Sequence, residues 1–504
     1  MRVALALTLL AAPLHAQHRL PLPADPLARI DAAVLAAARG DARVDVLILG
    51  RTQLLEPIGG LEKFAKQHAA ADRRKLRTTV IADLKRIAQP EQTKILKSLG
   101  DRPTIKYWIY NAIAASLDSA ELRRIAAMDE VRFIYSAPAV PRARQRESDS
   151  MRAVLKPAER RPFDATGKRI PWNLQKLDVP AAWAAGATGE GVVVASLDNG
   201  VNYLHPDLTN NIWINRREIA DNGKDDDGNG YVDDLYGYNF ARMDPEIGAF
   251  IPGPGPTQHG SVTSGIVAGD GSGGIVTGVA PRARIMALQG NGIISAPLAF
   301  QYALENGADI MSMSFSIPNL GNARGLWRLM ADHAVAAGLV LAGGAGNFQQ
   351  NQPIPVQHQS PKDVPSVISV GGVDSLFQLV PFSSMGPVEW SNVELYRDYP
   401  MPNGMIKPDV VAFPGAGYPV LSYPSGYIDP NNTTRGNSLS GPQGAGVAAL
   451  MFSVAPSLPA WRVMPILKAT ARDLGEPGPD NRFGSGLINA AAAVRMAKSE
   501  RPNR

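Results

Sequence analysis

The chain contains no cysteine among its 504 residues. This absence excludes disulfide scaffolds, thiolate zinc sites, iron–sulfur clusters and cysteine nucleophiles. Charge is also scarce, since charged residues make up 19% of the chain and the net charge is only +5. So small a positive charge does not indicate a nucleic-acid partner, and we expect none. The hydrophobic fraction of 45% is nevertheless ordinary for a globular protein, so a chain that is disordered throughout is excluded.

Long apolar runs are missing as well, apart from a short one at the start. Arg2 precedes an apolar stretch over residues 3–12, which is followed by Pro13 and by Ala16 before Gln17. This pattern is typical of a signal peptide over residues 1–16, and it is favoured over a buried helix by its position and its flanks. No later run reaches the roughly 18 residues of a membrane span. We therefore expect a secreted protein, periplasmic or extracellular, without stable membrane insertion.

The mature chain is predicted to hold a small N-terminal unit, a linker, a large domain and a short tail, with boundaries at residues 17–140, 141–170, 171–497 and 498–504. The small unit has an α+β pattern that suggests a ferredoxin-like fold, although one of its four strands is not evident. Its strands are expected at 44–49, 106–113 and 131–135, and its helices at 73–88 and 120–128, the second one capped by Asp118. The linker is rich in proline and arginine, which indicates an exposed, cleavable segment.

The large domain alternates short aliphatic strands with helices. The strands are expected at residues 192–197, 284–288, 310–314, 339–342 and 367–370, and helices between them at 297–305 and 325–337. This alternation predicts an α/β fold, a mostly parallel central sheet with helices on both faces. Functional side chains should then gather at the carboxyl ends of the strands.

Three residues of the large domain could together form a catalytic site. Asp198 ends an apolar strand, where a carboxylate is costly unless it is paired. His259 opens a helix that is rich in glycine and serine, and Ser438 directly precedes a helix of small residues. Taken one at a time, they could be a turn residue, a packed histidine and a helix cap. Together they offer an orienting acid, a base and a nucleophile.

The chain order of these residues decides between families of serine hydrolases. In α/β-hydrolases the histidine follows the serine, but the last histidine here is His358, well before Ser438. A serine esterase of that kind is therefore disfavoured. The order Asp198, His259, Ser438 is the order of the subtilisin type.

Residues 172–497 resemble the subtilases, the subtilisin-like serine proteases. The resemblance is carried by nine blocks in the family's order: 196–200, 259–265, 278–281, 342–347, 366–374, 382–387, 407–410, 436–442 and 484–489. One such block would be weak evidence, but nine in order make coincidence very improbable. The resemblance implies a subtilisin-like fold and hydrolysis of peptide bonds in proteins or peptides. It also implies that the N-terminal unit is a propeptide that binds its own catalytic domain, which we expect to be a monomer.

The resemblance implies roles for individual residues. Ser438 would attack the peptide carbonyl, His259 would carry the proton and Asp198 would orient the imidazole ring. Asn347 would donate a hydrogen bond to the oxyanion that forms. Substrate would be held by the residues Ser314, Phe315, Ser316 and Gly344.

The sequence departs from the family's pattern beside several of these residues. The departures are Asn199, Val262, Ser316 and Asn437. None of them removes a group that attacks or transfers a proton, but Ser316 and Asn437 border the oxyanion and specificity regions. The alternative is therefore a catalytically inactive subtilase that binds peptides or acts as a scaffold.

An acidic loop over residues 221–234 contains six aspartates and one lysine. An EF-hand is disfavoured, because Tyr236 occupies the position where that motif needs a bidentate glutamate. Oxygen ligands packed so densely would repel one another without a cation, and many subtilases carry a similar calcium loop. The sequence therefore predicts a structural Ca²⁺ ion held by Asp221, Asp225, Asp227, Asn229 and Asp233.

Overall fold

The computed structural model describes residues 17–40, 42–138, 155, 163–248, 259–415, 417–428 and 435–500. The predicted signal peptide (1–16) lies outside this part of the chain, as do most of the predicted linker and residues 501–504 of the tail. Among the described residues, no helix is both long enough and apolar enough to cross a membrane.

The N-terminal unit is built on a four-stranded antiparallel sheet with the strand order β4-β5-β2-β6. The strands are β2 (Val44–Gly50), β4 (Ile105–Tyr107), β5 (Ala112–Leu117) and β6 (Val131–Ser136). Helix α3 (Arg73–Leu99) follows β2, and helix α4 (Ser119–Ala126) follows β5. This βαββαβ connection is the predicted ferredoxin-like one. Shorter elements complete the unit: β1 (His18–Arg19), η1 (Pro26–Arg29), α1 (Ala32–Ala37), β3 (Thr52–Gln53) and α2 (Gly60–Gln67).

Two local features of this unit bear on the sequence predictions. Helix α4 begins with a capping box, in which the Asp118 side chain accepts from the Glu121 N–H while the Glu121 side chain accepts from the Asp118 N–H. The single strand expected at 106–113 is wrong, because residues 108–111 form a turn that separates β4 from β5. Asn111 occupies a left-handed conformation (φ 48°) in this turn. The split supplies the strand that the sequence pattern did not reveal.

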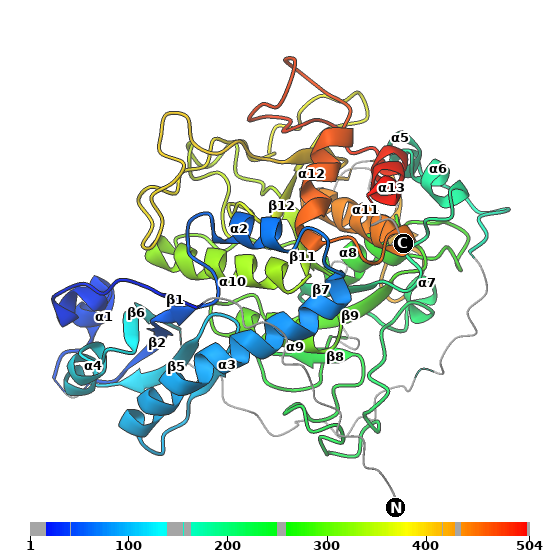
Figure 1. Ribbon diagram of the computed structural model, residues 1–504. Helices are drawn as coiled ribbons and strands as arrows, with labels where there is room; N and C mark the ends of the chain where they lie inside the picture. The colour runs from blue at the N-terminus through cyan, green and yellow to red at the C-terminus, as the bar shows by residue number, and fades with distance from the viewer. Residues whose placement is uncertain are drawn as a thin grey trace, which may run out of the picture.

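The large domain is built on a seven-stranded parallel sheet with the order β13-β12-β11-β10-β7-β9-β8 (Figure 1). Its strands are β7 (Val193–Asp198), β8 (Gly237–Asn239), β9 (Arg284–Gln289), β10 (Ile310–Met313), β11 (Val340–Gly344), β12 (Ile368–Gly372) and β13 (Val410–Ala412). A separate hairpin pairs β14 (Val420–Leu421) with β15 (Tyr427–Ile428). The predicted α/β fold with a parallel sheet is confirmed.

Helices cover both faces of the parallel sheet. Helices α8 (His259–Ala268) and α11 (Ser440–Val454) contact each other and pack on one face. Helices α9 (Ser295–Glu305) and α10 (Arg324–Ala336) cover the other face. The remaining helices are α5 (Trp172–Lys176), α6 (Val179–Ala184), α7 (Pro206–Thr209), η2 (Gly321–Ala323), α12 (Ala460–Thr470) and α13 (Ala490–Ser499).

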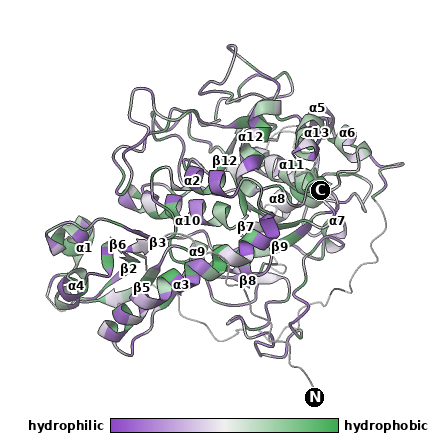
Figure 2. Ribbon diagram, viewed as in Figure 1, coloured by the Kyte–Doolittle hydropathy of each residue, from purple (hydrophilic) through white to green (hydrophobic). Residues whose placement is uncertain are grey.

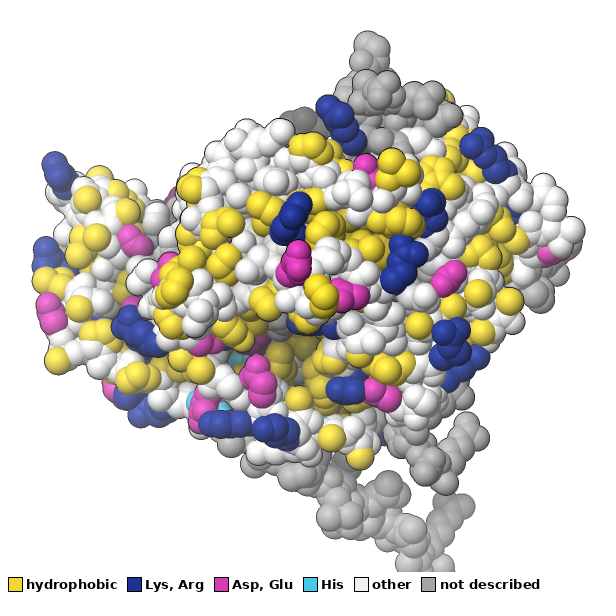
Figure 3. Space-filling view, turned by 90° about the horizontal axis from the view of Figure 1, so that it is seen from above, with side chains coloured by type: hydrophobic (Ala, Val, Ile, Leu, Met, Phe, Trp, Pro, Cys, Tyr) yellow, Lys and Arg dark blue, Asp and Glu magenta, His cyan; other side chains and the backbone are white. Residues whose placement is uncertain are grey.

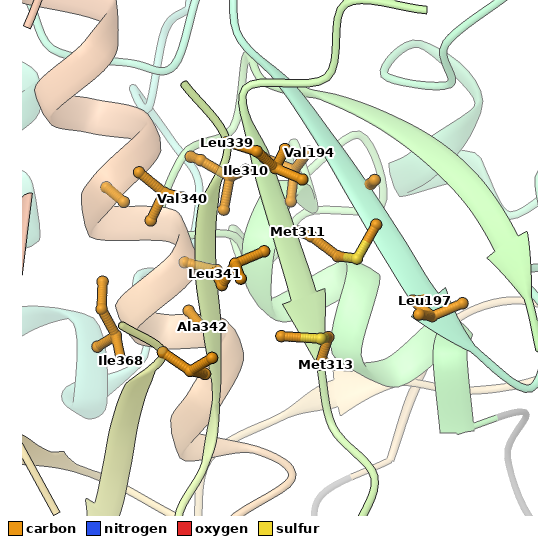
Figure 4. Close-up of a cluster of buried hydrophobic side chains, with 14 of the residues drawn as sticks. Val194, Leu197, Ile310, Met311, Met313, Leu339, Val340, Leu341, Ala342 and Ile368 are labelled. Carbon is orange, nitrogen blue, oxygen red and sulfur yellow. The ribbon is translucent and has the colours of Figure 1, made fainter. Parts of the chain in front are cut away.

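The central strands are buried on both sides, which explains their almost continuous apolar sequences. Figure 4 shows side chains of four neighbouring strands packed into one cluster, among them Val194, Ile310, Leu341 and Ile368. Each of these four side chains is at most 2% exposed. Burial of each aliphatic side chain of this size contributes about 1.5–3 kcal/mol to the free energy of unfolding. The sheet is therefore a stable support for the side chains at its edge.

The N-terminal unit packs directly on the large domain, and the two share one hydrophobic core. Helix α3 runs beside α9, and α2 contacts α10 (Figure 1). Figure 2 shows that hydrophilic and hydrophobic residues alternate along α3, as expected for a helix with only one buried side. Arg73 on α3 forms a buried ion pair with Asp309 of the large domain, at 2.6 Å.

The face in Figure 3 mixes acidic, basic and hydrophobic side chains without a concentration of one charge.

Candidate active site

Asp198 and His259 meet at the carboxyl edge of the parallel sheet. Asp198 is the last residue of β7, and His259 is the first residue of α8. The close approach depends on Gly260, because a Cβ atom there would lie only 2.2 Å from the carbonyl oxygen of Gly200. The absence of a side chain at this position therefore allows the helix to begin directly beside the carboxylate.

The carboxylate holds the imidazole ring from one side. His259 Nδ1 lies 2.7 Å from Asp198 Oδ1 and 3.0 Å from Oδ2. Thr263 Oγ1 also donates to Asp198 Oδ2, at 3.1 Å. Burial lowers the pKa of His259, but the hydrogen bond and the charge of Asp198 outweigh this effect, so the pKa lies above its ordinary value. The pair can therefore stabilise an imidazolium ion, which a histidine that accepts a proton must become.

Ser438 lies just before α11, and it contacts the segment that follows β10. Met313, the last residue of β10, pairs with Leu197 of β7, so Ser314 follows at the same edge of the sheet as Asp198. Ser314 Oγ donates to the carbonyl oxygen of Ser438 at 3.0 Å. The hydrogen bond that Ser438 Oγ makes within the described residues goes to the carbonyl oxygen of Ser314, at 3.2 Å, and not to His259. The nucleophile candidate is thus fixed beside the predicted substrate residues 314–316.

Asn347 lies at the other side of Ser438 with its amide group oriented by the backbone. Asn347 Oδ1 accepts from the backbone N–H of Asn437 at 2.8 Å, which leaves the amide nitrogen free to donate. Asn437 itself is buried, and its side chain donates to the carbonyl oxygen of Gly346 and to Ser383. Asn437, one of the departures from the family's pattern, therefore fixes the loop that carries Asn347.

One cavity of about 240 Å³ joins most of the predicted residues. It is lined by Ser438 and Asn347, by the predicted substrate residues and by three further residues: Ser314, Phe315, Ser316, Gly344, Gly346, Phe348 and Lys362. Gly344 belongs to the backbone wall, because a Cβ there would lie 1.7 Å from the carbonyl oxygen of Asn437. Sequence reasoning missed Lys362, and the unusual serine at position 316 was the available signal, since Lys362 Nζ donates to Ser316 Oγ at 2.7 Å.

The acidic loop brings together a smaller set of carboxylates than the sequence suggested. Glu218, Asp225 and Asp227 could hold a metal ion, since one oxygen of each lies within 4.8 Å of the others. Glu218 precedes the loop and was not predicted. It is 7% exposed, and its Oε2 atom has no hydrogen-bond partner within the described residues. Burial raises the pKa of this carboxyl group.

The other predicted ligands lie outside this group of three carboxylates. Asp233 accepts hydrogen bonds from the backbone N–H groups of Asn222 and Gly223. The side chain of Asn229 donates to Asp234, and its oxygen accepts from the N–H of Tyr231. Asp221 is likewise not part of the group.

An α/β fold that carries an acid, a histidine and a serine in this chain order is typical of serine proteases. Residues 189–486 match the model of the subtilase family. Bacillopeptidase F of Bacillus subtilis (strain 168) is 27% identical over 467 residues, which cover 86% of this chain but only 29% of that protein. Subtilisin NAT of Bacillus subtilis subsp. natto is 29% identical over 332 residues, covering 65% of this chain and 71% of that protein. The chain therefore belongs to the subtilase family of subtilisin-like serine proteases, and by class it is a serine endopeptidase.

Proposed function

We propose that the protein is a secreted endopeptidase that cleaves peptide bonds with Asp198, His259 and Ser438, and with Asn347 as oxyanion donor. The observation that carries this proposal is the 2.7 Å contact between His259 Nδ1 and Asp198 Oδ1. Ser438 and Asn347 support it, since they line one cavity at the same edge of the sheet. The predicted signal peptide is the basis for secretion.

The reaction follows from these positions. The Ser438 hydroxyl turns from the Ser314 carbonyl to His259 Nε2, gives its proton to that nitrogen and attacks the peptide carbonyl carbon. The carbonyl oxygen becomes an oxyanion, which accepts a hydrogen bond from the Asn347 amide. His259 then returns the proton to the leaving amine as the C–N bond breaks. In the second half, a water molecule gives a proton to His259 and attacks the acyl carbon, and Ser438 leaves with the proton that His259 returns. Asp198 stabilises the imidazolium ion in both halves of the reaction.

We also propose that the N-terminal unit is a propeptide and that the enzyme cuts its own chain within residues 141–170. Its close packing on the large domain supports a role in folding and latency, because parallel sheets are intrinsically slow to fold. Its position supports inhibition as well. Asp31 of the unit lines a cavity together with Ile317 and Leu320, which follow the substrate strand.

A calcium ion is proposed at Glu218, Asp225 and Asp227. Carboxylate oxygens are the ligands that Ca²⁺ prefers. The Oε2 atom of the buried Glu218, which has no hydrogen-bond partner among the described residues, fits a cation nearby. The ion would offset the repulsion among these carboxylates and stabilise the loop in a chain without disulfides.

The proposed function is tested by the intact mass of the secreted protein with and without a fluorophosphonate that labels active serines. We expect the wild-type protein to lose the N-terminal unit and to gain one label on Ser438. The variant Ser438→Ala should keep its full mass after removal of the signal peptide and should carry no label. Normal maturation of this variant in isolation would contradict self-cleavage. Failure of the wild-type protein to react with the probe would instead favour an inactive, peptide-binding subtilase.

A further inference from the structure

A buried ammonium group lies in the cavity beside Ser438. Lys362 is 1% exposed, and its Nζ atom donates to the carbonyl oxygen of Phe315 and to Ser316 Oγ. An ammonium group has three N–H donors, so one of them has no partner within the described part of the chain. The aliphatic stem packs along β11, where a Cβ on Gly343 would lie 3.0 Å from the Lys362 Cδ atom. The charged end is thus directed at the substrate strand by the packing of its stem.

Lys362 differs from other buried cations because it has no ion pair within the described residues. Lys407 is equally buried, but its Nζ atom lies 2.6 Å from Asp409. Arg73 has the same kind of partner in Asp309. The neighbouring carboxylate of Asp363 does not serve Lys362 in this way, because it pairs with Arg324 at 2.7 Å. A buried charge is costly unless it is paired, so the ammonium group of Lys362 would be stabilised by a carboxylate that the surrounding residues do not supply.

The cavity is placed to receive one particular side chain of a bound peptide. During acyl transfer the carbonyl carbon bonds to Ser438 Oγ, and its oxygen points to Asn347. The Cα atom next to this carbonyl carries the side chain closest to both residues. Because Ser438 and Asn347 line the cavity together with Lys362, the side chain just before the cleaved bond enters there.

We propose that Lys362 makes the enzyme select peptides with aspartate or glutamate immediately before the cleaved bond. The carboxylate of the peptide supplies the missing partner of the ammonium group, and Ser316 holds that group in place. This inference rests on the proposed function, and it names the substrate class of the same site. In the free protein, burial lowers the pKa of Lys362 to about 7, so the amine and the ammonium ion coexist near neutral pH, and a nearby carboxylate favours the ammonium ion.

The test uses the processed enzyme and four peptide p-nitroanilides that differ only in the last residue: Glu, Gln, Leu or Phe. We expect kcat/KM for Glu to exceed that for the isosteric Gln by ~10- to 100-fold, as for a hydrogen bond between charged groups. The variant Lys362→Met keeps the aliphatic stem and removes the charge, so the ratio of Glu to Gln should fall to about one. The matched control Lys176→Met removes an exposed lysine and should leave the ratio unchanged.

The outcomes separate this inference from the proposed function. The amount of enzyme in each sample is set by fluorophosphonate labelling, so a loss of folded protein does not alter the ratios. A Glu-to-Gln ratio near one in the wild-type enzyme, or an unchanged high ratio in Lys362→Met, overturns the role of Lys362 while cleavage of the Leu or Phe peptide upholds the protease. The Glu-to-Gln ratio of the wild-type enzyme tests the inference even if the Lys362→Met variant does not fold. Absence of both labelling and cleavage overturns the proposed function itself.

Discussion

The surface between the N-terminal unit and the large domain differs from the cleft at Ser438 in the partners that its main polar side chains have. In the interface, Arg73 pairs with Asp309, Tyr107 donates to the carbonyl oxygen of Ile294 at 2.8 Å, and the Gln301 side chain accepts from the backbone N–H of Trp108. In the cleft, by contrast, the amide nitrogen of Asn347 and one N–H of the Lys362 ammonium group have no partner among the residues that the structure describes. The interface groups named here bond across the contact between the two parts, although Arg73 Nε has no hydrogen-bond partner within the described residues, whereas the two cleft groups keep a donor that a substrate could use.

Two histidines show the same difference. His333, in the interface, is fully buried, with Nδ1 2.6 Å from the Ile109 carbonyl oxygen and Nε2 accepting from the Leu55 N–H. Burial lowers its pKa to about 4, so this histidine is neutral at physiological pH. His259 has a carboxylate partner, and its pKa is raised. One ring is held neutral by the packing, and the other is prepared to take a proton.

The largest effect is expected from removal of the interface cation. In the uncleaved Ser438→Ala chain, Arg73→Met should lower the free energy of unfolding by about 3–5 kcal/mol, because Asp309 then loses its closest cation while it stays buried. Urea titration measures the change. The control Lys75→Met changes an exposed residue of the same helix and should cost less than 1 kcal/mol. Equal effects of the two variants would remove the distinction between interface and surface.

In the cleft, Asn347→Ala should lower kcat by ~10²–10³-fold, with little change in KM. The amide nitrogen of Asn347 has no partner within the described residues, so the cost in stability is limited to the backbone N–H of Asn437, which loses its acceptor, about 1–3 kcal/mol. Steady-state kinetics on a peptide substrate measure both constants. A large loss of stability with unchanged kcat would show that Asn347 belongs with the structural groups.

The two histidines should give opposite pH dependences. The folded-state pKa of His333 lies below the ordinary value of 6.5, so its contribution to stability is present above pH 6.5 and is lost as the pH falls toward 4. In the Ser438→Ala chain, this loss should amount to about 3 kcal/mol by pH 4, and His333→Gln should flatten it. Denaturant midpoints at several pH values measure it. If the stability of His333→Gln fell just as steeply with decreasing pH, groups other than His333 would be responsible for the loss.

His259 gives the complementary pH dependence in the cleft. Its folded-state pKa is raised, so the stability it contributes is full below pH 6.5 and is lost as the pH rises through the folded-state value. Catalysis requires the neutral ring, and kcat/KM should therefore fall on the acid side with a midpoint above pH 6.5. The pH profile of the processed enzyme measures this midpoint. An acid limb near pH 4 would contradict the assigned environment.

The smallest effect is expected at the acidic cluster, where a buried oxygen of Glu218 has no hydrogen-bond partner in the described ranges. At a calcium concentration about 100 times the dissociation constant, removal of the ion by a chelator should cost ~2.7 kcal/mol of stability. The variant Glu218→Gln should shrink this difference, whereas Asp226→Asn, in the same loop but outside the group, should not. Thermal unfolding with and without chelator measures it. Identical curves would place Glu218 among groups that need no ion.

The sequence predicted those parts of the fold and site that depend on local pattern. Aliphatic runs indicated the main strands of the parallel sheet. The structure brings together Asp198 at a strand end and His259 at a helix start, although they are 61 residues apart in the chain. The turn at residues 108–111 was missed because Trp108, Ile109 and Tyr110 continue the apolar pattern of the flanking strands. Lys362 and Glu218 were missed for other reasons. Lys362 is 46 residues from Ser316, so only tertiary packing brings the two together. Glu218 lies just before the acidic loop, but no local pattern indicated that its carboxylate turns back to Asp225 and Asp227.

The core shared by the N-terminal unit and the large domain has a consequence for activation. Cutting the connecting peptide breaks one covalent bond but leaves the apolar contacts and the Arg73–Asp309 pair in place. Nicked protein should therefore stay latent until the unit is degraded, and the delay between the change in mass and the first turnover would report the lifetime of that intermediate.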